Sequence, residues 1–272
     1  MSKLLKAFLV VALIWILVVG AGYFAWGQFQ SFVPRLLQVN ERAEGTETIT
    51  REATDITDIS VDTKNDSVTV VATEGVDIVI NAFYTAQGNS VANANDRLKE
   101  LRTEVSTTGA TMNVEGIYPS TTINNQSIRY EIAIPKSLNL KVRTSNGRIN
   151  VEEIAGKIDL RTSNGTVDVK SQVGPEELLV YTSNGKINVS ATPTGGVYNL
   201  RTSNGTVTVS LPEDLGVTLK ASTSNGSIDL GYGQWTFAGG QLSNKNVSAQ
   251  FGDGSLNLDI QTSNGSVKLQ KR

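Results

Sequence analysis

The sequence of 272 residues contains no cysteine and no histidine. The lack of cysteine excludes disulfide bonds and thiol nucleophiles, and the lack of both residues excludes zinc sites built from Cys and His. A histidine general base is excluded for the same reason. A cysteine-free chain is compatible with an oxidising or a reducing compartment, so the redox environment stays open.

The chain also lacks an excess of charge of either sign. It has 24 Lys and Arg residues against 26 Asp and Glu residues, which gives a net charge of -2. Nucleic-acid binding requires a basic surface dense enough to release many counterions. We therefore expect no nucleic-acid partner.

The length of the chain is sufficient for a sizeable core.

An uncharged run stands near the N-terminus. After Lys3 and Lys6, residues 7–26 are mostly apolar and carry no charge, and a run of this length can cross a bilayer once. We predict a signal anchor or transmembrane helix over residues 1–26. The lysines favour an N-terminus in the cytoplasm, which leaves the rest of the chain outside, in the periplasm or at the cell surface. The alternative is a secretory signal cleaved after residues 20–22, which would release a secreted protein.

Residues 27–45 contain Pro34 and charges of both signs, and we predict that they form a stalk. From residue 46 onward, apolar residues alternate with polar ones, which is typical of half-buried strands. The prediction for residues 46–137 is an irregular β-solenoid. A short helix near residues 89–104 interrupts it, because residues 95–102 are good helix formers.

The phrase Thr-Ser-Asn-Gly dominates the rest of the chain. It begins at Thr144, Thr162, Thr182, Thr202, Thr223 and Thr262, at intervals of 18, 20, 20, 21 and 39 residues. The last interval spans two periods, with a degenerate copy at residues 242–245. A period near 20 residues, with a pair of alternating apolar residues on either side of the phrase, is typical of stacked β-coils. We predict an all-β fold, a β-solenoid whose coils pair as parallel strands over residues 138–272, with a capping flap near 231–253.

The repeated phrase is interpreted as the corner of each coil. Asn-Gly tolerates a positive φ, which sharp corners often need. Stacked asparagines can also bond side chain to side chain in a ladder, and the threonines can form a second ladder. The predicted ladder residues are Asn146, Asn164, Asn184, Asn204, Asn225 and Asn264. A minor alternative is that these amides face solvent and bind a regular polymer.

Outward positions are better candidates for binding. Arg143, Arg161, Tyr181 and Arg201 stand just before the phrase and should form a stripe with about 4.8 Å per step. Arginine beside tyrosine suits acidic polymers or sugars. The equivalent row on the other strand comprises Asn150, Asp168, Asn188, Thr208 and Asp229. Both rows are also compatible with ordinary solvated faces.

No catalytic, metal-binding or cofactor-binding set of residues is predicted. Glycoside hydrolysis needs two carboxyls about 5 to 9.5 Å apart. Asp168 and Asp229 are expected three coils apart, roughly 14 Å, which is too far to cooperate. The segment 253–259 carries alternating oxygen groups, but its spacing fits no calcium loop, and Asp253-Gly254 is explained as a hairpin turn.

The sequence resembles a known bacterial family, the putative-adhesin domains of unknown function, which are β-strand-repeat proteins. The similarity rests on residues 132–140 (Ile-Ala-Ile-Pro-Lys-Ser-Leu-Asn-Leu), on the Thr-Ser-Asn-Gly coils that follow, and on the closing segment 252–265. It covers residues 46–272. The resemblance implies a single-stranded parallel β-helix, and an N-terminal anchor is typical of the exported members. It implies no catalytic or binding residues.

The first functional hypothesis is a non-enzymatic, membrane-anchored, extracytoplasmic module for adhesin-like binding or scaffolding, with a glycan or surface-protein ligand. The second is a polysaccharide-acting β-helix enzyme. The third is a self-assembling envelope element that pairs through its terminal coil, for which Val267 is the expected contact.

Overall fold

The computed structural model describes residues 41–119, 125–231, 233–237 and 243–272. The predicted membrane helix over residues 1–26 and most of the predicted stalk lie outside these residues. Among the helical segments that are described, none combines the length and the apolar character needed to cross a bilayer.

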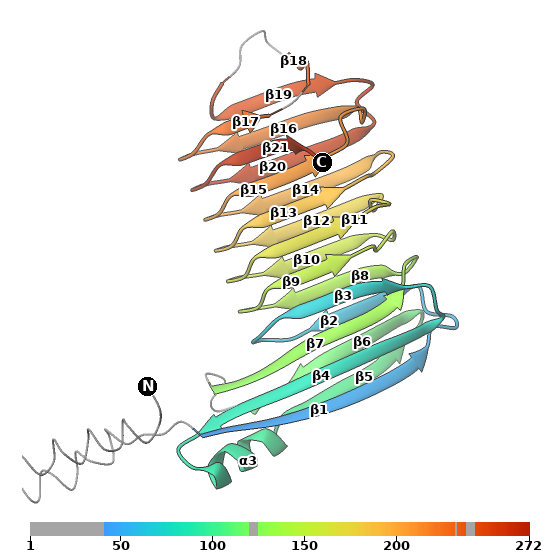
Figure 1. The fold of residues 1–272 in the computed structure, drawn as a ribbon, viewed down its shortest axis with the longest axis vertical. Helices are drawn as coiled ribbons and strands as arrows, with labels where there is room; N and C mark the ends of the chain where they lie inside the picture. Colours follow the sequence, from blue (N-terminus) through green and yellow to red (C-terminus); the bar gives the residue numbers. More distant parts are fainter. Residues whose placement is uncertain (1–40, 120–124, 232, 238–242) are drawn as a thin grey trace, which may run out of the picture.

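The described strands form two sheets that run along one elongated column (Figure 1). Sheet A has 10 strands in the order β1 (Glu41–Glu52), β4 (Asp77–Gly88), β7 (Gln126–Pro135), β3 (Val68–Thr73), β9 (Ile149–Glu152), β11 (Val167–Ser171), β13 (Ile187–Ala191), β15 (Val207–Leu211), β21 (Val267–Lys271) and β17 (Ile228–Leu230). Sheet B has 11 strands in the order β18 (Thr236–Phe237), β19 (Asn246–Phe251), β16 (Val217–Thr223), β20 (Leu256–Thr262), β14 (Gly196–Thr202), β12 (Glu177–Thr182), β10 (Ile158–Thr162), β8 (Asn139–Thr144), β2 (Asp58–Asp62), β6 (Thr111–Ile117) and β5 (Arg102–Thr108).

Each regular coil contributes one strand to each sheet, and a Thr-Ser-Asn-Gly corner joins the two. In one coil, β10 buries Ile158 and Leu160, and β11 buries Val167 and Val169. Neighbouring coils pair in parallel with equivalent positions opposite each other, so that Ile158 faces Leu178. The prediction of an all-β solenoid is confirmed.

The core is the line of apolar side chains that the two sheets enclose. Every regular coil adds aliphatic residues from both strands to one continuous buried cluster. Burying one such side chain contributes about 1.5–3 kcal/mol, and no single coil can bury its own. Stability therefore comes from stacking, and the outward residues are free to vary.

The N-terminal part combines parallel and antiparallel pairing. β1 pairs antiparallel with β4 from Glu41 to Glu52, and β4 pairs antiparallel with β7. The predicted stalk boundary at residue 45 is therefore wrong, because residues 41–45 already belong to a strand paired along its whole length. A helix, α3 (Val91–Lys99), lies inside the segment for which the sequence predicts one, and the Ser90 side chain caps it by accepting from the backbone N–H of Asn93.

The order of the last coils differs from their order in the sequence. β20 pairs with β14 on one side and with β16 on the other, while β21 pairs with β15 and β17. The C-terminal coil is thus inserted between two coils that precede it in the chain (Figure 1). Val267 is fully buried with neighbours on both sides. The predicted self-association at a terminal coil formed by Val267 is therefore wrong.

The predicted flap region contains an antiparallel end to sheet B. β19 runs antiparallel along β16, and β18 pairs with β19. Trp235 packs against Phe251 with ring centroids 5.6 Å apart. The degenerate repeat still makes a corner, since the backbone N–H of Thr223 bonds to Lys245 O and that of Ile228 to Asn244 O. After this corner the chain turns back along sheet B.

The corner glycines are required by close packing rather than by a positive φ. None of them is among the described glycines with positive φ, so that part of the corner prediction is wrong. A Cβ placed on Gly205 would lie only 1.9 Å from the carbonyl oxygen of Gly185 in the neighbouring coil. Successive backbones approach so closely here that no side chain fits.

We expect Gly205→Ala to lower the free energy of unfolding by about 1–3 kcal/mol, the usual cost of overpacking, because the obstacle is backbone rather than a flexible side chain. Urea denaturation followed by circular dichroism measures this. Gly75→Ala is the matched control, since its Cβ would meet Thr73 Oγ1 at an ordinary 3.5 Å. Equal stability of the two variants would show that the corner has room to spare.

A chain that ends at Ser255 lacks the inserted coil. We expect the amides of β16 and β17 to lose protection in hydrogen exchange, because these strands lose their partners β20 and β21. The amides of β8 to β13 serve as the internal control and should stay protected. If residues 217–223 kept wild-type protection, β16 would have to pair directly with β14, and the inserted coil would be dispensable.

Candidate functional site

The six corner asparagines form an unbroken ladder of side-chain amides. Each Nδ2 donates to the Oδ1 of the next coil at 2.7–2.9 Å, and the chain of bonds runs Asn225, Asn264, Asn204, Asn184, Asn164, Asn146 and finally Asn65. Asn264 lies between Asn225 and Asn204, as the inserted coil requires. The degenerate copy around Asn65 thus belongs to the same ladder.

The corner threonines do not bond to one another. Five of the six hydroxyls donate to the glycine carbonyl of the neighbouring coil instead, as Thr182 does to Gly165 O at 3.0 Å and Thr202 to Gly185 O at 3.0 Å, and that of Thr144 donates to Lys64 O. The polar groups of the corner therefore satisfy one another, which makes it a structural element.

The predicted stripe lies on the outer face of sheet B. Arg143, Arg161, Tyr181 and Arg201 are register partners on β8, β10, β12 and β14. The row continues to Gln261 of the inserted β20 rather than to a residue of β16. At the other end it meets Asp62 of β2.

Carboxylates in the adjacent row compensate the stripe arginines. Asp159 accepts from Arg161 at 3.0 and 3.3 Å and lies 3.9 Å from Arg143, while Asp259 lies 3.7 Å from Arg201. Tyr181 is 46% exposed. Because strand residues two apart share a face, Asp159 and Asp259 were the sequence signal for this compensation.

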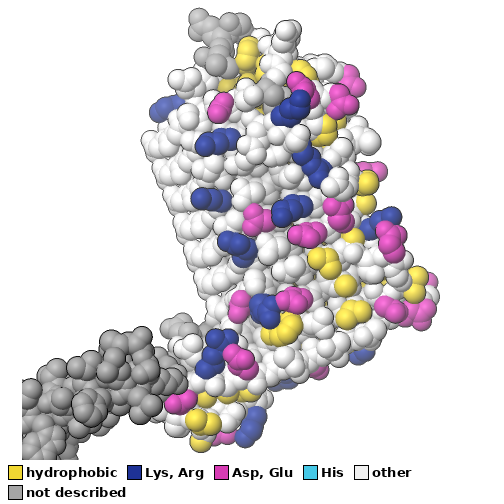
Figure 2. Space-filling view, in the orientation of Figure 1, with side chains coloured by type: hydrophobic (Ala, Val, Ile, Leu, Met, Phe, Trp, Pro, Cys, Tyr) yellow, Lys and Arg dark blue, Asp and Glu magenta, His cyan; other side chains and the backbone are white. Residues whose placement is uncertain are grey.

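The second predicted row lies on the outer face of sheet A. Asn188 donates to Asp168 at 2.7 Å, and Arg148 lies 3.9 Å from Asp168. The inserted β21 places Lys268 between Thr208 and Asp229. Asp168 and Asp229 are therefore four strands apart, not three. Figure 2 shows basic and acidic side chains interspersed over the visible face, without a large area of one sign.

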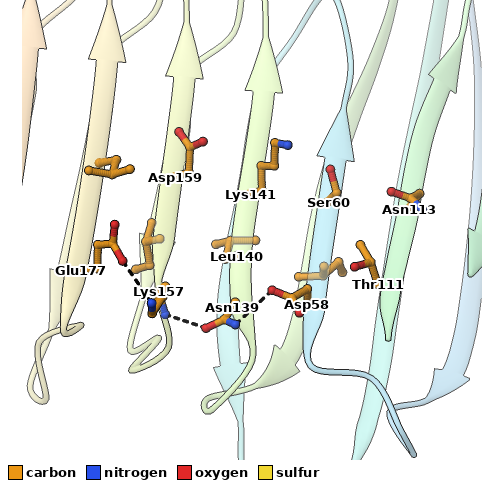
Figure 3. Close-up of a pocket in the computed structure, with 13 residues that line it drawn as sticks. Asp58, Ser60, Thr111, Asn113, Asn139, Leu140, Lys141, Lys157, Asp159 and Glu177 are labelled. Atoms are coloured by element: carbon orange, nitrogen blue, oxygen red, sulfur yellow. Dashed lines mark hydrogen bonds and ion pairs between the residues drawn. The ribbon is translucent and has the colours of Figure 1, made fainter. Parts of the chain in front are cut away.

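Sheet B also carries a hollow on its outer face, next to the stripe. It has a volume of about 370 Å³ and is lined by 13 residues of β2, β6, β8, β10 and β12 and of the turn before β10 (Figure 3). A chain of contacts crosses it: Asn139 Nδ2 donates to Asp58 at 3.0 Å, Asn139 Oδ1 accepts from the Lys157 backbone N–H at 2.9 Å, and Lys157 Nζ lies 3.3 Å from Glu177. The flanking row holds Asp159, Lys141, Ser60 and Asn113.

Sequence reasoning missed this hollow. Two of its strands, β2 and β6, belong to the irregular part, and β6 pairs in parallel with β2 although about 50 residues separate them. The alternation of Asp58 and Ser60 marks an outward face, but no local signal states which strand lies beside it.

The outer faces carry charged and polar side chains, many of which form ion pairs or hydrogen bonds with one another. Asp159 and Glu177 lie on neighbouring strands, but each is held in an ion pair, with Arg161 and Lys157 respectively. Over residues 41–119, 125–231, 233–237 and 243–272 no group of acidic side chains is placed to hold a metal ion.

Three tyrosines with a raised pKa, Tyr84, Tyr130 and Tyr198, are buried between the sheets. Burial, together with a hydrogen bond to Glu47, raises the pKa of Tyr84 to about 12. Burial likewise raises the pKa of Tyr130 and of Tyr198 above the ordinary value. These phenols stay protonated at neutral pH and lie away from the outer faces, so they act as packing groups.

Comparison with known proteins gives a family and a set of distant structural likenesses. Residues 136–270 match the Toastrack DUF4097 family, which confirms the predicted resemblance. A putative cell adhesion protein from Clostridium sporogenes is similar at 12% identity and a TM-score of 0.48, over 85% of this chain and 100% of that one. A putative adhesin from Bacteroides fragilis is similar at 11% identity and a TM-score of 0.45, over 83% and 97%. A putative lipid binding protein from Parabacteroides distasonis is similar at 12% identity and a TM-score of 0.31, over 84% and 97%. No curated protein sequence matches the chain.

Proposed function

We propose that this solenoid of the Toastrack type is a non-enzymatic module for adhesin-like binding or scaffolding. In this proposal residues 1–26 anchor it in the cytoplasmic membrane, and residues 41–272 stand outside the cytoplasm. The observation that carries the proposal is the outer face of sheet B, where the parallel register holds equivalent side chains in straight lines.

Such a face is suited to binding because little has to be ordered when a ligand arrives. The strands are fixed by their neighbours on both sides, and the outward side chains repeat at about 4.8 Å. Pre-ordered contact groups reduce the entropy cost of association. Tyr181, which is exposed between Arg161 and Arg201, supplies a flat apolar ring flanked by bidentate donors.

A polysaccharide-acting enzyme is the weaker alternative. Asp168 and Asp229, four strands apart, are separated by about 19 Å at the usual strand spacing. Glycosidases hold their two carboxyls about 5 to 9.5 Å apart. The closer pair, Asp159 and Glu177, is engaged with cations. The geometry therefore favours binding over hydrolysis.

The binding proposal is tested with the full-length chain in detergent micelles against a panel of envelope glycans and surface proteins. We expect R161A/Y181A/R201A to weaken binding of the captured ligand by about tenfold or more, equivalent to ~1.4 kcal/mol. The variant K170A/K186A is the control, because it also removes two positive charges but from β11 and the corner before β13. Equal loss in both variants would point to net charge rather than to the stripe.

The location is tested by single-cysteine labelling, which the cysteine-free chain permits. We expect Ser163→Cys, at an exposed corner, to react with a membrane-impermeant maleimide on intact spheroplasts. Ser2→Cys should react only after lysis, and both variants should stay in the membrane fraction at full mass. Labelling of Ser163→Cys only after lysis would reverse the proposed orientation, and a shortened product would indicate a cleaved signal.

A further inference from the structure

Three neighbouring polar side chains lie in the hollow of sheet B. Asn113 of β6 faces Ser60 of β2, and Ser60 faces Lys141 of β8, so the three form one line across the strands (Figure 3). All three are half-buried and point outward. They offer an amide, a hydroxyl and an ammonium group at successive steps of about 4.8 Å.

These three side chains differ from Asn139 and from the other charged groups that line the hollow, because those groups already have protein partners. Asp58 accepts from Asn139, Glu177 binds Lys157, and Asp159 binds Arg161. Within the part of the chain that the structure describes, no hydrogen bond or ion pair engages the side chains of Asn113, Ser60 or Lys141. Half-buried donors that no protein group engages remain able to bond to a ligand with acceptor atoms.

The hollow has two charges without an ion-pair partner among the described residues. Asp58 bonds to the neutral Thr57 and Asn139, and Lys141 is the cation that no carboxylate binds. Its register partner on β10 is Asp159, but the carboxylate of Asp159 is shared by Arg161 and Arg143. These two arginines stand in the next row and share one carboxylate, so a net positive charge remains at the rim. The middle of the hollow therefore suits an oxyanion, since charge-assisted hydrogen bonds to an ammonium are stronger than neutral ones.

We propose that this hollow binds the anionic group, a carboxylate or a phosphate, of a polyhydroxylated polymer. Lys141 acts as the counter-ion, and Ser60 and Asn113 donate hydrogen bonds to the same group. Asp58 of β2 and Glu177 of β12 accept hydrogen bonds from hydroxyl groups of the polymer on either side of its anionic group. The inference rests on the proposed binding function and names its ligand class.

The assignment separates Lys141 from the stripe. Arg161 and Arg201 form ion pairs with Asp159 and Asp259 and flank the ring of Tyr181, so this part of the stripe is nearly neutral. Lys141 has no such partner within the described residues. An anionic group therefore gains more binding free energy at the hollow than at the stripe. The stripe can hold the uncharged remainder of the same polymer.

The test is isothermal titration of the full-length chain in detergent micelles with three oligomers: galacturonate for carboxylate, glycerol phosphate for phosphate, and neutral dextran. We expect one or both anionic oligomers to bind, more weakly at high salt because the charge is partly exposed. Lys141→Gln should raise the Kd by about tenfold or more, and S60A/N113A by several-fold. Lys170→Gln, a lysine on the opposite sheet, is the matched control and should leave the Kd within about twofold.

All the substituted positions face outward, so we expect the variants to keep the melting temperature of the wild type. An unchanged melting temperature shows that a variant folds. Equal affinity of wild type and Lys141→Gln overturns the inference, as does dextran binding as tightly as the anionic oligomers, or binding of neither anionic oligomer. A panel ligand that R161A/Y181A/R201A loses and Lys141→Gln retains overturns this inference alone and leaves the proposed function standing. Failure of the whole panel, with the anionic oligomers still bound through Lys141, contradicts the stripe and supports the hollow.

Discussion

The close approach of successive backbones at the Thr-Ser-Asn-Gly corner is the constraint on which the rest of the structure depends. In the regular coils, a Cβ added to a corner glycine would lie only 1.8–1.9 Å from the glycine carbonyl oxygen of the neighbouring coil. That approach brings each threonine hydroxyl to a carbonyl and each asparagine amide to its neighbour. The strands of the regular coils then keep one register, and their outward residues line up as a consequence.

Much of this fold could be predicted because the deciding signals are local. A turn phrase, flanked by pairs of alternating apolar residues, specifies two strands and a corner whatever the neighbours are. The stacking order could not be predicted in the same way, because every coil presents the same corner chemistry and accepts any other coil beside it. Asn264 bonds to Asn204 in the same way that Asn146 bonds to Asn65. The reason for the corner glycine was also beyond the sequence, since a positive φ and a close contact select the same residue.

The surfaces were predictable to a smaller extent. Arg143, Arg161, Tyr181 and Arg201 lie side by side because register follows from the repeat. Their compensation depends on which arginine Asp159 takes, and that is a matter of side-chain geometry. The hollow required β2 and β6 to be placed beside β8, a pairing between distant parts of the chain that no pattern announces. Lys141 owes its unpaired state to both effects.

The inserted C-terminal coil has a consequence for how the molecule is made. Synthesis on the ribosome is vectorial, and β20 and β21 are made after β14 to β17, yet they stand between them in the two sheets. β14 and β16 therefore cannot meet their final neighbour until β20 has been made. Arg272 then bonds to Leu211 O and to Ser171 O, residues of two coils completed long before. A chain cut short before Leu256 lacks this closure, which leaves β14 and β15 without the neighbours that cover their edges and open to pairing with other chains.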